Sequence, residues 1–260
     1  MVECSESGEK NTASISVATY NVRKAIGGDY RRDPERVLEA VANLGVDIVA
    51  LQEADYRFKQ RKPIFSSSQV RHHTQLHTVS LNHNQNGLGW HGNILLVNPD
   101  LRILDARTIE LKGLEPRGGL LVDLAHGDTE IRVICAHLGL LAAYRRRQAE
   151  TLVEAADPGS GRVTLMMGDF NCWGKGRWSL KPFRDCMQEA ECGKTFPAGF
   201  PVAALDQIFY AGPLQLKSAG RIQTGLTRMA SDHLPVRAQF DIGAAAAPDA
   251  GRPQAQPALA

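Results

Sequence analysis

Four short apolar runs in this chain of 260 residues each end in a side chain that can bind a metal or move a proton. ISVATY is followed by Asn21, DIVALQ by Glu53, IRVICA by His137, and VTLMMG by Asp169, with Asn171 two residues further on. Runs of this length and composition predict buried β-strands. The chain is therefore expected to fold around sheets whose strands present polar groups at their carboxyl ends.

Asn and Asp residues directly after a strand are also common turn formers, so a purely structural interpretation of Asn21, Asp169 and Asn171 stays open. Glu53 and His137 are poorer turn formers. The repetition of the pattern across four strands favours a functional interpretation. Side chains alternate along a strand, so Asp169 and Asn171 share a face if the chain stays extended.

A second polar cluster lies further along the chain. Asp206 begins the run DQIFY, and Ser231, Asp232 and His233 precede LPVRAQF. Asp232 and His233 cannot form a dyad with each other, because adjacent side chains diverge. They can instead offer a carboxylate to a metal and an imidazole to a phosphate or a water. An ordinary polar turn before a strand is the alternative interpretation.

The candidate metal ligands are mostly hard oxygen donors. Carboxylate and amide oxygens suit Mg²⁺ or Mn²⁺ better than structural zinc. The five cysteines contain no CxxC pair, which argues against a zinc site and against a disulfide framework. A reducing cytoplasm is the expected setting. The oxygen donors considered are Asn21, Glu53, Asp169, Asn171 and Asp232.

Strands and helices interleave along the chain. Helices are expected from Asp33-Pro34 to Gly45, with Asp33 as N-cap, and over residues 142–156. Strands in series separated by short turns predict antiparallel pairing, so packed sheets flanked by helices fit better than a Rossmann sheet. No GxGxxG or Walker-type loop is present. The expected strands cover residues 14–20, 46–51, 93–97, 102–111, 119–124, 131–136, 163–167, 205–210 and 235–240.

The composition predicts one folded domain. The hydrophobic content is 43%, and 30 basic against 28 acidic residues give a net charge of +2, which excludes a generic polybasic nucleic-acid coat protein. No apolar run approaches the roughly 20 residues that span a bilayer, and residues 1–11 do not have the pattern of a signal peptide. We expect a flexible lead-in over 1–13, one domain over 14–242, and a disordered Ala/Pro-rich tail over 243–260.

These motifs occur in the order ATYNVR, IVALQEAD, GNILLVN, EPRGGLLVDL, VICAHLGL, MMGDFNCW, LDQIFY and SDHLPV. The ordered set resembles the endonuclease/exonuclease/phosphatase superfamily, which includes DNase I. The resemblance extends from about residue 14 to residue 240. It implies an α/β fold, a four-layer α-β-β-α sandwich of two mixed, mostly antiparallel sheets flanked by helices. It also implies a divalent-metal-dependent phosphoric ester hydrolase with its site at one edge of the sheets.

The resemblance implies a bound cation, Mg²⁺ or alternatively Mn²⁺, with Glu53 as its principal ligand. Asn21 and Asp232 complete or support that site. Asp169 and Asn171 orient the attacking water and bind a non-bridging phosphate oxygen. The chemistry explains these residue types independently, because a phosphodiester is an anion that repels hydroxide until positive charge offsets its own.

Four further roles follow from the same resemblance. His233, polarised by Asp206, acts on the water and the phosphate, as an imidazole with a carboxylate partner can near neutral pH. His137 contacts the phosphate and assists the leaving group. Arg117 in EPRG binds phosphate, and Asn93, in the GN that opens the following strand, is a second substrate-binding residue.

The substrate is less constrained. The abasic-site nucleases carry a tyrosine where His137 stands, which argues against abasic-site repair and favours sphingomyelinase-like, DNase I-like or small-phosphoester hydrolases. The leading expectation is a phosphodiesterase or phosphatase acting on a small or lipid-like phosphoester. A DNase I-like or repair nuclease is the alternative, and a catalytically inactive binding module is a third. We expect a monomer with no obligate protein partner.

Two local features could select the substrate. For Arg145, Arg146 and Arg147 a solvated helix face is favoured over a binding patch. Trp173 and Trp178 are able to stack a base or touch a lipid, with core packing of one tryptophan as the alternative.

Overall fold

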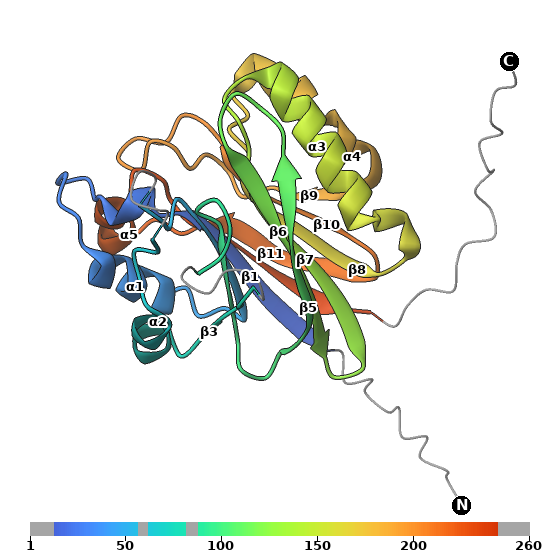
Figure 1. Ribbon diagram of the computed structural model, residues 1–260, viewed down its shortest axis with the longest axis horizontal. Coiled ribbons are helices and arrows are strands. Elements are labelled where there is room, and N and C mark those ends of the chain that lie inside the picture. The colour runs from blue at the N-terminus through green and yellow to red at the C-terminus, as the bar shows by residue number, and fades with distance from the viewer. Residues whose placement is uncertain (1–12, 57–61, 82–87, 244–260) are drawn as a thin grey trace, which may run out of the picture.

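The computed structural model describes residues 13–56, 62–81 and 88–243. Within them the chain forms two six-stranded sheets packed face to face, with helices on the outer side of each (Figure 1). This confirms the expected four-layer α-β-β-α sandwich. The predicted lead-in and tail lie, apart from Ala13 and Gly243, outside the described residues.

The first sheet contains both described ends of the chain. Its strand order is β11-β12-β1-β2-β4-β3, with β1 between the last strand and β2. Only β1 and β2 run parallel; the other neighbours are antiparallel. The bounds are β11 (Leu214–Arg221), β12 (Val236–Ile242), β1 (Ser14–Asn21), β2 (Ile48–Gln52), β4 (Ile94–Val97) and β3 (His77–Thr78).

The second sheet has the order β5-β6-β7-β8-β10-β9. Here β7 and β8 are the one parallel pair, so each sheet combines a parallel pair with antiparallel neighbours. The bounds are β5 (Arg102–Leu111), β6 (Arg117–His126), β7 (Thr129–His137), β8 (Val163–Asp169), β10 (Asp206–Ala211) and β9 (Gln188–Ala190).

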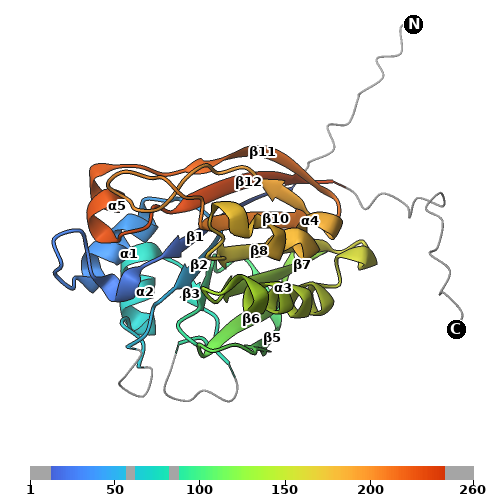
Figure 2. The same cartoon turned by 90° about the horizontal axis from the view of Figure 1, so that it is seen from above.

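Two groups of helices cover the sheets from outside. Figure 2 shows α1, α2 and α5 grouped on one side of the molecule and α3 and α4 on the other. Among the described residues, no helix combines the length and apolar composition that crossing a membrane requires. The bounds are α1 (Pro34–Ala42), α2 (Ser67–Thr74), α3 (Ala142–Ala156), α4 (Lys181–Cys186) and α5 (Gly225–Ala230), with 3₁₀ turns η1 (Arg23–Ala25), η2 (Pro158–Ser160) and η3 (Gly174–Leu180).

Alternation along each strand divides the interior into three cores. On β1, Val17 packs in the core between the sheets, whereas Ala18 packs beneath α1 and its neighbours. On β7, Cys135 faces the central core, whereas Ile134 and Ala136 face α3. Burying apolar area on both faces of both sheets is the main stabilising contribution, at roughly 25 cal/mol per Å². Continuous apolar runs, and not simple alternation, are the resulting sequence pattern.

Candidate active site

The candidate site is the polar end of the core between the two sheets. Four site residues are each an even number of positions from a strand residue that faces this core, such as Val17 or Met167. They are Asn21, His137, Asp169 and Asp206. Side chains two residues apart share a face of a strand, so these four polar groups extend the central core to its open edge. Sequence alternation therefore directs the expected site residues into the space between the sheets.

Strand direction brings these residues to the same edge. In the parallel pair of the second sheet, His137 lies opposite Asp169. Asp206, at the beginning of antiparallel β10, also lies opposite Asp169. At this edge a hydrogen bond crosses from sheet to sheet, because Asn21 Nδ2 donates to Asp169 Oδ2 at 2.9 Å. The site thus joins the two sheets.

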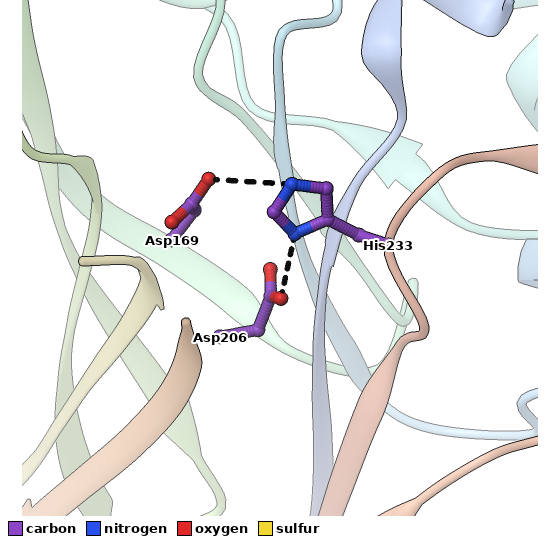
Figure 3. Close-up of side chains that lie close together, drawn as sticks. All are labelled: Asp169, Asp206 and His233. Atoms are coloured by element: carbon purple, nitrogen blue, oxygen red, sulfur yellow. Dashed lines mark hydrogen bonds and ion pairs between the residues drawn. The ribbon is translucent and has the colours of Figure 1, made fainter. Parts of the chain in front are cut away.

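His233 lies between two buried carboxyl groups (Figure 3). Its Nδ1 is 2.8 Å from Asp206 Oδ2, and its Nε2 is 3.8 Å from Asp169 Oδ2. The ring of Phe196 packs against the imidazole at 4.8 Å between centroids. His233 is fixed by a carboxylate on one side and an aromatic ring on its face, with Nε2 directed toward Asp169.

The pKa values of this group are strongly perturbed. Burial alone lowers the pKa of His233, but the Asp206 and Asp169 carboxylates outweigh it and raise the pKa to about 10. Burial raises the pKa of Asp169 to about 6, opposed by the charge of His233. Such shifts concentrate at functional sites, because catalysis requires proton affinities that solvent-exposed groups do not have.

A stability prediction follows from the pKa of His233. The folded pKa of about 10 exceeds the ordinary value of about 6.5. Its contribution to stability is therefore complete below pH 6.5 and is lost as the pH rises toward 10. In EDTA, we expect the wild-type Tm to be at least about 3 °C lower at pH 9.5 than at pH 7. Asp206→Asn removes the largest attraction, so its Tm should fall less; an equal fall in both proteins would contradict the assignment.

Asn171 connects Asp169 to His137. Its backbone N–H donates to Asp169 Oδ1 at 2.9 Å, and its Nδ2 lies 3.0 Å from His137 Nε2 and 2.9 Å from the Leu138 carbonyl. Asn171 has φ +48°, a left-handed conformation that costs a non-glycine residue about 1 kcal/mol or more. The chain turns here, so Asn171 does not simply continue the face of β8. The turn places its amide beside the histidine.

Glu53 lies at the opening of the site. Together with Arg117 and His137 it lines a pocket that Lys24, Asp55, His91 and Pro116 complete. Burial raises the pKa of Glu53, but the charge and hydrogen bond of Lys24, with smaller contributions from Arg117 and His233, bring it below its usual value. Glu53 is therefore a carboxylate at neutral pH, which is the form that binds cations.

The backbone ties Asn21 and the segment that carries Asp232 to the strand end that precedes Glu53. Asn21 is opposite Gln52, the residue before Glu53, in the parallel pair β1–β2. The Ser231 hydroxyl donates to the Asn21 carbonyl at 2.7 Å, which ties the segment carrying Asp232 to the end of β1. Two carboxylates and one amide oxygen are donors that Mg²⁺ or Mn²⁺ prefers, so the donor set fits the implied cation.

Asp169, Asp206 and His233 form a second group with ligand atoms within 4.8 Å of one another. Asp206 Oδ1 is buried and has no hydrogen-bond partner among the described residues. However, His233 Nδ1 already pairs with Asp206, and all three residues are buried. This arrangement suits proton transfer by the imidazole more than ligation through it.

Arg117 and Asn93 have different surroundings. The Arg117 guanidinium lines the pocket and pairs with Glu115 at 2.7 Å. Asn93 is 0% exposed, and its Nδ2 donates to the carbonyls of Trp90 and Gly118 at 3.1 and 2.9 Å. The Asn93 amide thus fixes the start of the strand that carries Arg117, and a substrate contact of Asn93 stays a prediction.

The solvated-face interpretation of the arginine run is wrong for Arg145. That residue is buried, and its guanidinium donates to the Ser179 hydroxyl at 3.0 Å and to the carbonyls of Gly139 and Leu140 at 3.1 and 2.7 Å. It joins the loop after His137 to η3. Arg146 pairs instead with Glu150 four residues on, as a solvated helix residue does.

Sequence reasoning missed Lys24 and His91, which line the pocket, and Phe196, which packs on His233. Lys24 could have been predicted to lie near the site, because it follows Asn21 by only three residues. The contact of Phe196 with His233 could not have been predicted, because nothing in the sequence places the loop of Phe196 beside the segment before β12.

Comparisons with known proteins agree with the fold. The chain is 28% identical over 248 residues to the "Uncharacterized protein YbhP" of Escherichia coli K12, covering 88% of this chain and 97% of that protein. A Bacteroides vulgatus endonuclease/exonuclease/phosphatase superposes with a TM-score of 0.71 at 17% identity, covering 89% of this chain and all of that one. D. rerio TDP2 in complex with a single-strand DNA product superposes with a TM-score of 0.66 at 15% identity. The match covers 88% of this chain and 99% of that one.

The family model described as "Endonuclease/Exonuclease/phosphatase family" matches residues 18–233. That span begins on β1 and ends at His233, so it includes every strand-end residue of the site. Members of the family are hydrolases that act on phosphoesters. The chain belongs to the endonuclease/exonuclease/phosphatase family.

Proposed function

We propose that the protein is a Mg²⁺-dependent hydrolase of phosphoester bonds, with Mn²⁺ as an alternative cation, acting on a small or lipid-like phosphoester. The observation that carries the proposal is the imidazole of His233 between Asp206 and Asp169, at the same edge as the pocket of Glu53, Arg117 and His137. Proton transfer, cation binding and anion binding are thereby available side by side.

Glu53, assisted by Asn21 and Asp232, would bind the cation. When bound, the cation offsets negative charge on the phosphoryl oxygens and stabilises the leaving oxygen. The pocket also contains the cationic Arg117 and the ring of His137, which can donate hydrogen bonds to a phosphoryl group. A phosphate anion in the pocket can therefore contact both the bound cation and the guanidinium of Arg117.

His233 and Asp169 would manage the attacking water. In its protonated form, His233 directs Nε2 toward Asp169 at 3.8 Å and can donate to a phosphoryl oxygen. After releasing that proton, the same nitrogen accepts one from water. The contact of Nδ1 with Asp206 fixes the ring in both forms. Asp169, fixed by Asn21 and by the backbone of Asn171, orients the water.

Asp206→Asn is expected to reduce turnover, but by less than His233→Ala does at the same pH. The amide keeps the size of the side chain, so the imidazole stays in place while losing the negative charge that raises its pKa. Measuring kcat for both variants at saturating Mg²⁺ checks the order. A larger loss for Asp206→Asn than for His233→Ala would contradict the assigned roles.

A nuclease is the second candidate function. One structural relative, D. rerio TDP2, was solved with a single-strand DNA product. Trp173 and Trp178 follow Asn171 and are 45% and 50% exposed, so neither is simply a core residue. Exposed aromatic rings beside a phosphate site are able to stack nucleobases.

A substrate panel tests both candidates. Purified protein would be assayed with bis-p-nitrophenyl phosphate, phospholipids, plain DNA and abasic DNA, each with Mg²⁺ and with EDTA. Turnover of the small ester or the lipid supports the leading proposal, and turnover confined to DNA supports the second. Absence of Mg²⁺-dependent turnover on all of them would contradict the proposed function. Glu53→Gln protein prepared in parallel controls for contaminating hydrolases.

A further inference from the structure

One turn directs two basic side chains at two of the proposed cation ligands. Arg23 and Lys24 belong to η1, between β1 and α1, and with Ala25 they have φ values of +44°, +56° and +58°. Three successive non-glycine residues in the left-handed region cost about 1–2 kcal/mol each. Such an arrangement persists only where surrounding contacts impose it, and strained turns of this kind concentrate at functional sites.

The contacts that impose it lie on the acids of the site. Arg23 Nε pairs with Asp232 Oδ2 at 3.2 Å. The Lys24 backbone N–H donates to the Glu53 carbonyl at 3.0 Å, and the Lys24 ammonium pairs with Glu53 Oε2. Lys24 is thus bound to Glu53 through both its backbone and its side chain.

Only the side-chain contact competes with a metal. The Lys24 ammonium pairs with Oε2 of the same carboxylate that would bind the divalent cation, and the two positive charges repel each other, so a cation that binds Glu53 would displace the ammonium. The backbone hydrogen bond of Lys24 to Glu53 can remain when this happens. A lysine ammonium on its flexible four-carbon stem can move without the turn being rebuilt.

The displaced ammonium has an anion site beside it. Lys24 lines the same pocket as Arg117 and His137, the two groups assigned to phosphate. Its side chain is 27% exposed, as is that of Glu53, so both reach the pocket opening. A phosphoryl group in this pocket lies within reach of a third positive side chain.

We propose that Lys24 is a phosphate-binding residue that pairs with Glu53 until a divalent cation takes that carboxylate. The inference rests on the proposed function in that Glu53 is the cation ligand. The ammonium changes its partner from a carboxylate oxygen to a phosphoryl oxygen, and no covalent bond is made or broken. The exchange couples phosphate binding to cation binding.

The first arm of the test measures Mg²⁺ binding alone by isothermal titration calorimetry. Lys24→Met keeps the length of the side chain but removes the competing charge, so we expect about tenfold tighter Mg²⁺ binding, or about 1.4 kcal/mol. Lys217→Met is the matched control, because Lys217 pairs with Asp241 on β11–β12 outside the pocket. Its Mg²⁺ affinity should equal that of the wild type.

The second arm titrates inorganic phosphate at saturating Mg²⁺. Here Lys24→Met should bind phosphate about tenfold more weakly, whereas Lys217→Met should match the wild type. The two effects of Lys24→Met have opposite signs, which a general loss of structure does not produce. Thermal melts of each variant verify that it is folded.

Unchanged or weaker Mg²⁺ binding by folded Lys24→Met overturns the displacement. Unchanged phosphate binding overturns the exchange of partners. A wild-type protein that binds no Mg²⁺ would contradict the proposed function itself and the exchange with it. Tighter Mg²⁺ binding together with weaker phosphate binding supports the inference.

Discussion

Glu53→Gln is expected to lower Mg²⁺-dependent turnover by about 10³-fold or more while the protein stays folded. Charge stabilisation by a cation is worth several kcal/mol, and each 1.36 kcal/mol corresponds to a factor of ten. The amide oxygen can still accept a hydrogen bond from Lys24, so the local structure keeps its contact. What the variant loses is the negative charge that binds the cation.

Steady-state turnover across a Mg²⁺ titration checks this expectation. Glu39→Gln is the matched control, because Glu39 is exposed on α1 and does not line the pocket. The control should retain wild-type turnover and the wild-type Mg²⁺ dependence. A Glu53→Gln enzyme that turns over at the wild-type rate would remove Glu53 from the cation site.

His233→Ala is expected to reduce turnover by about 10²–10⁴-fold, the usual contribution of general acid–base catalysis. Mg²⁺ binding should persist, because the assigned ligands are unchanged. The same change at His137 should also reduce turnover by orders of magnitude, since it removes a phosphate contact. If both histidines were only structural, their loss would lower Tm while turnover per folded molecule stayed near the wild-type value.

Thermal melts and Mg²⁺ calorimetry alongside kcat separate these outcomes. His72→Ala is the control, since His72 is exposed on α2. Near-wild-type kcat in folded His233→Ala would refute the catalytic role of the segment from Ser231 to His233. A variant that had lost Mg²⁺ binding would show that His233 belongs to the cation site.

The layered fold was predictable because its strands carry strong local signals. The expected strand 102–111 and helix 142–156 coincide with β5 and α3. The strand β11 was missed because none of its residues is buried and they include polar and small side chains, so no apolar run marks it. The helix α2 was missed because one buried residue, Val70, leaves no apolar stripe to detect.

The site was predictable residue by residue but not as an arrangement. Alternation along β1 and β8 is local, so Asn21 and Asp169 could be expected at strand ends. The sequence does not reveal that the two sheets bring these ends within hydrogen-bond distance. The pairing of His233 with Asp206 spans 27 residues, and the family resemblance supplied it, not the local pattern.

Left-handed residues were the hardest to predict. Glu53, like Lys24, has a positive φ, at +53°. Propensity assigns this region to glycine, asparagine and aspartate, so a run of arginine, lysine and alanine gives no warning of it. Only tertiary contacts, here the two ion pairs of η1, explain why the chain adopts it.

The place of β1 between β2 and β12 has a consequence for how the molecule is made. Ser14 pairs with Asp241, so the strand that begins the fold completes its sheet only with the strand that ends it. A nascent chain that has emerged as far as β8 already contains Glu53, His137 and Asp169, yet it lacks Asp206 and His233. If Asp206 and His233 have the proposed roles, hydrolytic capacity arises late in synthesis. A fold closed by such long-range pairing forms more slowly than one built from local contacts.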